Sequence, residues 1–378
     1  MRKFFIIIGI NFAVFCTLIV GLELIGQILY YAKNGRFVFQ TPEPGYKVRA
    51  NDPNYYHYQS LFESHPLLVV RPVKNMQVTD YMSDKKITTT DIHTRWTGSP
   101  EDNDQLIKIA VLGGSTTFGT GVTDSDSWPA ILQAKLGDNF SVINYGIPCY
   151  STAESIAQMA LVVPESEPDF VVFYEGWNDI VLYHDDAFSP DFYNHGMNVM
   201  DCVQVERYKR KSLFDKLNEL SAIVRLASKI KSNATDHSED PESCVTFDTP
   251  DPKVDTIYQR NLNTLKAISE QTAEYTLFVP QVLNHRWFEE KGKSKTFYDC
   301  WSRIKNSAMP RLMDRFNLIM KGICLPDDPK CVYVGGVEEV DWVPDDFVDD
   351  GHFSKQGGEK FAEIIKQAIL SKTQNSQE

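Results

Sequence analysis

The stretch IKIAVLGGSTTFG, Ile107 to Gly119, decides how the rest of this chain is interpreted. An apolar run of strand length stops at Gly113 and Gly114, and Ser115 follows directly, before residues that can open a helix. The two glycines let the backbone turn sharply and let a second group approach it closely, as a nucleophile at the carboxyl end of a strand requires. Ser115 is therefore a candidate nucleophile, and a plain structural turn is the alternative.

A glycine-rich turn between a strand and a helix can also hold a phosphate on the amides of the helix N-terminus. The stretch lacks the GK[ST] ending of a P-loop, and it lacks the third glycine of GxGxxG at the required spacing. It is not GxSxG either, because Thr117 stands where the second glycine would be. These differences argue against the common phosphate-binding loops.

The composition is that of an ordinary folded protein. The 378 residues are 42% hydrophobic and 24% charged, enough for one large domain or two modest ones. The formal net charge of -13 is spread along the chain, which favours solubility and argues against nucleic acid as the main partner. We interpret the one short basic run, RYKRK at 207–211, as a solvated helix face.

Residues 1–31 predict a membrane-spanning helix. After Met1-Arg2-Lys3 comes an apolar segment, and Phe4 to Leu22 alone would span roughly 28 Å as a helix, about the thickness of a bilayer core. A cleaved signal peptide is the alternative, but no small-residue A-x-A site follows the apolar run, so an uncleaved signal anchor is favoured. We expect the amino terminus in the cytoplasm and the body outside it, although basic residues flank the segment on both sides.

Residues 32–105 are rich in Tyr, Pro, Asn and Asp and show no long helical period. They predict a juxtamembrane segment that wraps the main domain, with short extended stretches at 65–73 and 77–82. The acidic run at 101–104 marks the boundary with the main domain.

From Leu106 onward, strand-like segments alternate with helical segments, which predicts a parallel sheet covered on both faces. The expected strands are 107–112, 141–145, 170–174, 275–279 and 331–334. The expected helices are 128–136, 152–162, 254–275 and 357–370. In a doubly wound sheet the functional site lies beyond the carboxyl ends of the strands, near the point where the strand order reverses.

An insertion at about 184–255 interrupts this alternation. Its centre, 212–231, repeats apolar residues at helical spacing: Leu213, Leu217, Leu220, Val224 and Ala227. We expect this stripe to pack on the main domain, and a cap over the substrate is the alternative. The polar end of the chain, 371–378, is predicted to be a disordered tail.

Polar motifs follow several of the expected strands. They are INYGIPCYST (143–152), YEGWNDI (174–180) and, near the carboxyl end, FVDDGHFSKQGG (347–358). Together with the GGS of the first strand end, they resemble the SGNH (GDSL-type) hydrolases, esterases and acyl-transfer enzymes, over 106–370 apart from the insertion. The resemblance implies a flavodoxin-like three-layer α/β/α fold with a five-stranded parallel sheet, here preceded by an N-terminal transmembrane helix.

The resemblance also implies roles for individual residues. In the first block the family's GDS appears as GGS, so Ser115 matches the nucleophile and Gly114 replaces the usual aspartate. In the last block DxxH places the acid and the base at Asp349 and His352. A base is needed because a serine hydroxyl attacks an ester only as its proton is removed, and neutral imidazole suits that task near neutral pH. Asp349 would orient the imidazole ring and stabilise the imidazolium that forms.

The oxyanion hole is implied by the two remaining blocks. The family's glycine lies five residues after the asparagine that ends the second strand, and counting from Asn144 gives Cys149 rather than Gly146. A cysteine can still offer its main-chain N–H if its backbone angles allow it. The GxND block is intact, so the amide of Asn178 would be the third donor, with the amides of Ser115 and Cys149. No cofactor is implied.

Metal binding is not predicted, because the other histidines lack metal-ligand spacing, among them His184, His195 and His285. Disulfides are expected, because an extracytoplasmic body permits them. Cys324 and Cys331 flank a short loop with two prolines, and Cys202 and Cys244 bracket the insertion, so these two pairs are proposed. Two cysteines of the body then remain, Cys149 and Cys300.

The sequence thus predicts a membrane-anchored SGNH-like serine esterase with its domain outside the cytoplasm. Its expected substrates are O-acyl groups, such as acetyl, on a cell-envelope glycan or glycolipid, or a small ester. An O-acyltransferase with the same triad is an alternative, because the acyl-enzyme is common to both. A catalytically inactive, membrane-tethered glycan-binding or assembly protein is the alternative from another class, supported only by the changes at Gly114 and Cys149. The oligomeric state is left open.

Overall fold

The computed structural model describes residues 2–34, 37–39, 61–79, 85–101, 103, 105–180, 189–192, 199, 202–203, 217, 220–227, 251–291 and 304–375. The chain divides into two compact units. The smaller unit is Met1–Lys47 with Lys209–Asp240, and the larger unit is Val48–Tyr208 with Pro241–Glu378.

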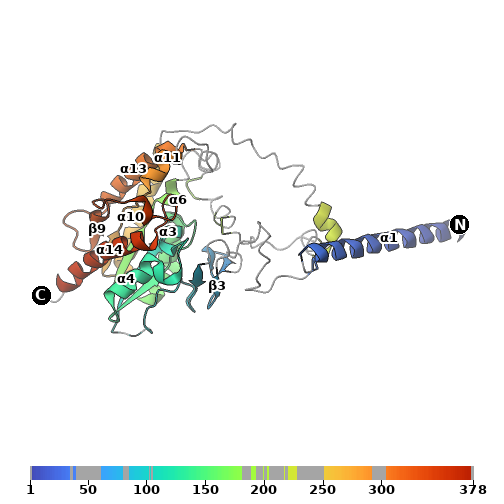
Figure 1. Ribbon diagram of the computed structural model, residues 1–378, viewed down its shortest axis with the longest axis horizontal. Coiled ribbons are helices and arrows are strands. Elements are labelled where there is room, and N and C mark those ends of the chain that lie inside the picture. Colours follow the sequence, from blue (N-terminus) through green and yellow to red (C-terminus); the bar gives the residue numbers. More distant parts are fainter. Residues whose placement is uncertain are drawn as a thin grey trace. The chain divides into compact units, whose positions relative to one another are not determined.

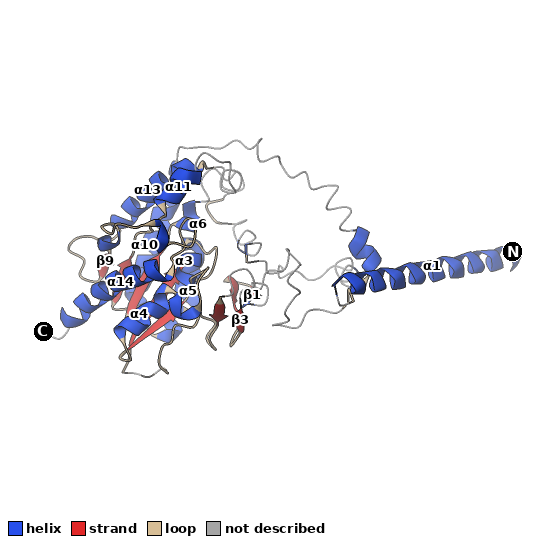
Figure 2. Cartoon of the chain, viewed as in Figure 1, coloured by secondary structure: helices blue, strands red, loops and turns tan. Residues whose placement is uncertain are grey.

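The larger unit is built on a five-stranded parallel sheet with the strand order β6-β5-β7-β8-β9. Figure 2 shows strands of this unit in red among helices in blue. The strands of the sheet are β5 (Ile107–Gly113), β6 (Phe140–Asn144), β7 (Phe170–Tyr174), β8 (Tyr275–Phe278) and β9 (Cys331–Tyr333). This is the flavodoxin-like order, and it reverses at β5, which lies between β6 and β7. The predicted fold is therefore confirmed, and each of the five expected strands forms.

Helices cover both faces of the sheet (Figure 1). One face packs on α4 (Trp128–Leu136) and α14 (Lys355–Asn375), and the other packs on α5 (Thr152–Leu161), α10 (Pro252–Thr272) and α13 (Met309–Lys321). Along β7 successive side chains alternate between the two cores, as a strand buried on both faces requires: Phe170, Val172 and Tyr174 in one, Val171 and Phe173 in the other.

Shorter helices connect these elements. They are α3 (Ser115–Phe118), α6 (Trp177–Ile180), α11 (His285–Lys291) and the 3₁₀ helices η1 (Asp124–Asp126), η2 (Val163–Ser166), η3 (Asn306–Ala308), η4 (Gly335–Val337) and η5 (Pro344–Asp346). The helices α3 and α6 each begin directly after a central strand, so they determine what lies at the carboxyl edge of the sheet.

The segment before the sheet forms two small antiparallel sheets. Their strands are β1 (Phe62–His65), β2 (Val69–Pro72), β3 (Gln77–Thr79) and β4 (Lys86–Thr88). The prediction of an extended stretch over 65–73 is confirmed for β2 and wrong for residues 66–68, where the chain turns after β1 before Val69, which has a positive φ of 67°. Residues further on cover the edge strand β6: Arg95 N–H donates to the Asn144 carbonyl at 3.2 Å, and the Thr97 hydroxyl donates to the Val142 carbonyl at 2.6 Å.

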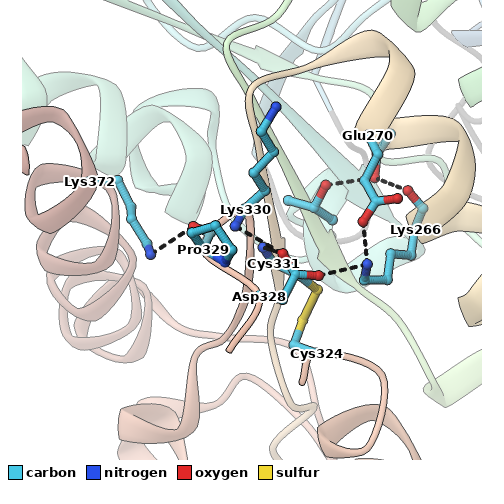
Figure 3. The surroundings of a disulfide bond; sticks show 10 residues. Lys266, Glu270, Cys324, Asp328, Pro329, Lys330, Cys331 and Lys372 are labelled. Carbon is cyan, nitrogen blue, oxygen red and sulfur yellow. Dashed lines mark hydrogen bonds and ion pairs between the residues drawn. A yellow bond between two sulfur atoms is a disulfide. The ribbon is translucent and has the colours of Figure 1, made fainter. Parts of the chain in front are cut away.

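The last helix runs further than the sequence suggested. α14 continues to Asn375, so the expectation of a disordered tail is wrong for residues 371–375. Two hydroxyls bond back to carbonyls within the helix, Ser371 to Ala368 and Thr373 to Leu370. Lys372 Nζ donates to the carbonyl of Pro329 at 3.0 Å (Figure 3), which holds the end of the helix on the loop before β9.

That loop is closed by the disulfide between Cys324 and Cys331, whose Cα atoms are 5.2 Å apart, as the sequence predicted (Figure 3). Inside the loop the Asp328 carboxylate accepts from the N–H groups of Lys330 and Cys331 and pairs with Lys266 Nζ at 2.7 Å. Lys266 and these hydrogen bonds lower the pKa of Asp328, although partial burial opposes them.

The second disulfide differs from the predicted pair. Cys202 bonds to Cys149, with 6.4 Å between the Cα atoms, and not to Cys244. Cys244 and Cys300 lie outside the described residues. The pairing Cys202–Cys244 is therefore wrong, and Cys149 is not left over.

The smaller unit contains α1 (Arg2–Asn34). Within the described part of the chain, one helix, Lys3–Lys33, is long and apolar enough to cross a membrane, with a mean hydropathy of 2.6 in its most apolar window. A membrane anchor and a signal sequence both meet this criterion.

Two polar residues of α1, Glu23 and Gln27, bind a segment of the insertion. The Glu23 carboxylate accepts from Ala222 N–H at 2.6 Å, and Gln27 Nε2 donates to the Leu220 carbonyl at 2.9 Å. The insertion helix is formed by residues 222–227, and its first turn lies against Gly26 of α1. Ala222 and the backbone of this segment thus contact α1. The expectation that the apolar stripe packs on the main domain stays a prediction. Of the described residues of that stripe, Leu217, Leu220 and Ala227 are exposed and Val224 is half-buried, and Leu213 lies outside the described residues.

Candidate active site

Ser115 is the first residue of α3 and stands at the carboxyl end of β5. The turn before it requires glycine. Gly113 has a φ of 151°, and a Cβ added there would lie 2.3 Å from Thr117 Oγ1 and 2.4 Å from the Tyr174 carbonyl oxygen. Gly113 is therefore needed for the backbone to turn, and the turn leaves the Ser115 side chain partly exposed.

The short helix α3 is held from several sides. Trp128 Nε1 donates to the Thr116 carbonyl at 3.1 Å, and Asn144 Nδ2 donates to the Thr117 carbonyl at 3.0 Å. The buried guanidinium of Arg95 donates to the Phe118 carbonyl at 2.7 Å and to the carbonyls of Gly119 and Val122. A four-residue helix is not stable by itself, so these contacts fix the position of Ser115.

Asp349 and His352 lie on the loop between η5 and α14. The Asp349 carboxylate accepts from the N–H groups of Gly351 at 3.0 Å and His352 at 2.8 Å, which closes a tight turn. Asn284, which follows β8, supports the loop: its Nδ2 donates to the Asp349 carbonyl at 3.0 Å, and its N–H donates to the Asp350 carbonyl at 2.9 Å.

The structure brings Ser115, His352 and Asp349 into one hydrogen-bonded row. His352 Nε2 lies 2.7 Å from Ser115 Oγ, and His352 Nδ1 lies 2.7 Å from Asp349 Oδ2. When Nδ1–H donates to the carboxylate, Nε2 is left as an acceptor for the serine hydroxyl. Such a row can move a proton from the serine to the imidazole.

The charges in this row shift both pKa values. Burial would lower the pKa of His352, but the carboxylates of Asp349 and Asp350 outweigh it, and the pKa is raised above its usual 6.5. Burial would raise the pKa of Asp349, but His352 and the two backbone N–H groups outweigh it and lower the pKa to about 2. Asp349 is thus ionised at neutral pH, and the imidazolium is stabilised when it forms.

The other two predicted site residues follow the strands on either side of β5. Cys149 comes after β6 and has a positive φ of 68°, a conformation typical of glycine. Asn178 lies in α6, after β7, and its Nδ2 donates to the Tyr150 carbonyl at 2.7 Å. One of its two amide hydrogens is used in that bond, which leaves the other available.

Gly146, the alternative to Cys149 in the second block, is a packing residue. A Cβ there would lie 2.4 Å from the backbone nitrogen of Phe118. Its role is to let the loop after β6 approach α3.

Three buried carboxylates behind the site were not singled out from the sequence. Asp179 accepts from Thr152 N–H at 3.1 Å and from the Thr152 hydroxyl at 2.5 Å, which joins α6 to the start of α5. Glu175 accepts from the Ser155 hydroxyl, and Glu154 accepts from Ser151 N–H at 2.9 Å. Burial, and then the charge of Asp179, raise the pKa of Glu175 well above its usual 4.5.

The signal for Asp179 was present in the sequence, because it belongs to the intact GxND block. For Arg95, Asn284 and Glu175 there was none, since each acts through a partner distant in sequence.

Asp349, Asp350 and His352 also present three ligand atoms within 4.8 Å of one another, the arrangement a metal ion would need. Both ring nitrogens of His352 already have partners, Ser115 and Asp349, so the donor set fits a proton relay better than a metal ion.

A parallel sheet with a serine, histidine and aspartate joined at its carboxyl edge has the arrangement of a serine hydrolase. The family model of the GDSL-like lipase/acylhydrolase family matches residues 111–301, half of the 378-residue chain. The chain belongs to this family, and it is a serine hydrolase of the SGNH type. The matched stretch contains Ser115, Cys149 and Asn178 and ends before Asp349 and His352.

Several solved structures are similar to this chain. A lipase/acylhydrolase from Enterococcus faecalis has 13% identity and a TM-score of 0.38, covering 70% of this chain and 95% of its own. A GDSL-like lipase from Bacteroides thetaiotaomicron has 12% identity and a TM-score of 0.39, covering 72% and 92%. A mutant of an acetyl-xylooligosaccharide esterase from Geobacillus Stearmophilus has 13% identity and a TM-score of 0.36, covering 73% and 96%. A sequence search of curated proteins finds no match.

Proposed function

We propose that this protein is a membrane-anchored serine esterase that removes O-acyl groups, such as acetyl, from a cell-envelope glycan or glycolipid. The observation that carries the proposal is the row of two 2.7 Å hydrogen bonds from Ser115 through His352 to Asp349. It supports Ser115 as the nucleophile, His352 as the base and Asp349 as the residue that orients the base.

In the acylation step, Ser115 Oγ attacks the carbonyl carbon of the ester while His352 Nε2 takes the hydroxyl proton. The carbonyl oxygen becomes an oxyanion, and the N–H groups of Ser115 and Cys149 and the amide of Asn178 are the proposed donors to it. The imidazolium then gives its proton to the leaving alcohol, and the acyl group stays on Ser115.

In the second step, His352 removes a proton from water as the water attacks the acyl-enzyme. The same donors stabilise the second oxyanion, and the proton returns to Ser115 Oγ as the acid leaves. A glycan hydroxyl in the place of that water would give transfer instead of hydrolysis.

Location supports the choice of substrate. A membrane-spanning α1 would hold the enzyme at a membrane surface, with the amino terminus inside and the larger unit outside the cytoplasm. The two disulfides favour this side, because such bonds persist in oxidising compartments. Acylated glycans and glycolipids are the ester substrates that such a site would meet.

The test is hydrolysis of a short-chain aryl acetate by the full-length chain in detergent micelles. We expect Ser115→Ala and His352→Ala each to lower kcat by several orders of magnitude, and the double variant to be no slower, because the two side chains act as a unit. The matched controls are Ser125→Ala and His285→Ala, both at exposed positions, which should retain wild-type rates.

The substrate class is then tested by measuring the release of free acetate from an O-acetylated glycan by the wild type and the same variants. A donor with a labelled acyl group separates hydrolysis from transfer. Label found on an acceptor hydroxyl, and not as free acid, would contradict the proposed esterase activity and favour an acyltransferase. Equal rates for the wild type and Ser115→Ala would refute the serine mechanism.

A further inference from the structure

The backbone at Cys149 is unusual for a residue with a side chain. Tyr150 N–H donates to the Ile147 carbonyl at 3.1 Å, so residues 147–150 form a tight turn with Pro148 and Cys149 in its two central positions. Proline followed by a residue with positive φ is the pattern of a type II turn, in which glycine strongly prefers the second position. Cys149 occupies that position with a φ of 68°.

Without support, a non-glycine residue would leave this conformation for a more stable one. The conformation matters because it aims the N–H of Cys149, one of the proposed oxyanion donors. The neighbouring residues are fixed by other contacts: Tyr150 by its hydroxyl, which donates to the Val70 carbonyl at 2.6 Å, and Ser151 by the Glu154 carboxylate at 2.9 Å. No such hydrogen bond is seen for Cys149 among the described residues.

The side chain of Cys149 is held in another way, by its disulfide to Cys202. Cys202 is itself anchored, because Val199 and Val203 on either side of it are fully buried in the cluster that contains Phe118 and Ile147. Val203 N–H donates to the Val199 carbonyl at 3.1 Å, which ties together these two residues on either side of Cys202. The disulfide thus joins the turn to a fixed point in the core.

We propose that Cys202 is a positioning residue of the active site, which holds Cys149 in the left-handed conformation that its proposed role as an oxyanion donor requires. The inference rests on the proposed function. Glycine would adopt this conformation without support, whereas Cys149 is held in it by the disulfide. Cys202 of the insertion thus supports the oxyanion hole through Cys149.

The first measurement is peptide mapping of the unreduced full-length chain by mass spectrometry. A peptide that links Cys149 to Cys202 is expected, and its absence would overturn the inference whatever the activity.

The second measurement is aryl acetate hydrolysis by Cys202→Ser and by Cys149→Gly/Cys202→Ser. We expect the single variant to lower kcat by about 5- to 30-fold, the effect of releasing one non-glycine residue from this conformation. KM should change by less than about twofold, since the oxyanion forms only in the transition state. The double variant should recover kcat to within about threefold of the wild type, because glycine adopts positive φ without strain.

The matched control removes the other disulfide with Cys324→Ser/Cys331→Ser, which should leave kcat unchanged. A merely structural role for Cys202 predicts that the melting temperature falls and that glycine at 149 restores nothing. A double variant as slow as Cys202→Ser, or a Cys202→Ser enzyme that keeps the wild-type kcat, would overturn this inference and leave the proposed function standing. If hydrolysis does not depend on Ser115, the proposed function fails, and the inference falls with it.

Discussion

The substitution Gly114→Ala adds one methyl group beside the proposed oxyanion hole. The expected effect is argued from the contacts of this methyl group, because the φ of Gly114, -83°, is not in the left-handed region. The new Cβ would lie 2.4 Å from Asn178 Nδ2 and 3.2 Å from the Tyr150 carbonyl oxygen. The amide of Asn178 must therefore move, and its 2.7 Å hydrogen bond to Tyr150 must stretch or break.

The size of that movement sets the expected loss. To reach an ordinary contact of 3.4 to 4 Å, Cβ and Nδ2 must separate by a further 1.0 to 1.6 Å, and a misplacement of about 1 Å costs about 10²-fold in rate. Loss of the whole donor sets the upper limit at about 10³-fold. We expect kcat for aryl acetate hydrolysis to fall by about 10²-fold, with a small change in melting temperature because the end of one side chain can rotate away.

The control is Gly322→Ala, where the added Cβ would meet the Ile319 carbonyl oxygen at an ordinary 3.4 Å. It should keep the wild-type kcat. Gly114→Asp, which introduces the residue usual in the family motif, should be at least as slow as Gly114→Ala for the same steric reason. A Gly114→Ala enzyme within about threefold of the wild-type kcat would refute the view that Asn178 is a positioned donor.

Three other predictions concern charge and contact. Asp349→Asn should lower kcat by on the order of 10⁴ and move the acid limb of kcat/KM to lower pH, because the carboxylate that raises the pKa of His352 is gone. Glu175→Gln should raise the free energy of unfolding at pH 8 by on the order of 1 kcal/mol, and this gain should vanish towards pH 4. The sign follows from the raised pKa: the folded state keeps a proton that the unfolded state loses above about pH 4.5, so the wild type is destabilised as pH rises. Gly26→Cys/Ala222→Cys should form a disulfide, because the two positions are neighbours: a Cβ at Gly26 would lie 2.9 Å from that of Ala222, so the two segments need to separate by about 1 Å to reach disulfide geometry.

Each of these has an outcome that would contradict it. An acid limb that stays in place in Asp349→Asn would mean that Asp349 does not set the pKa of His352. Denaturant unfolding of Glu175→Gln that shows the same gain at pH 4 and pH 8 would exclude a titration effect. For the disulfide, the control is Gly9→Cys/Ala222→Cys, since no atom lies within 4 Å of a Cβ at Gly9. Equal yields from the two pairs would show that the contact is not specific.

The sheet could be predicted because strands buried on both faces leave uninterrupted apolar runs in the sequence. Ser115 could be singled out because its turn requires glycine for steric reasons, and glycine is visible in the sequence. The helix α13 was overlooked although its pattern was present: Met309, Leu312, Met313, Phe316 and Met320 recur at helical spacing and are buried.

Other features had no local signal. The partner of Cys149 is 53 residues away, and spacing does not determine disulfide connectivity. The turn of the β1–β2 hairpin, Pro66-Leu67-Leu68, is apolar, and proline is its only usual turn residue. The sequence therefore predicts an extended stretch there. The partners of Glu23 lie about 200 positions away along the chain, and no periodicity in α1 reveals them.

The contacts of Glu23 and Gln27, together with the disulfide of Cys202, mean that the insertion is attached at two separate places. Residues 220–227 bind α1, and Cys202 is covalently bonded to the loop after β6. The chain is thus linked to α1 twice, once through the backbone of residues 35–60 and once through the insertion. A single proteolytic cut within 40–60 would then leave α1 and the larger unit joined, and their separation would require the insertion to be cut or Glu23 to be replaced as well. Co-purification of α1 with the larger unit after such a cut, and its loss in Glu23→Ala, would establish this second link.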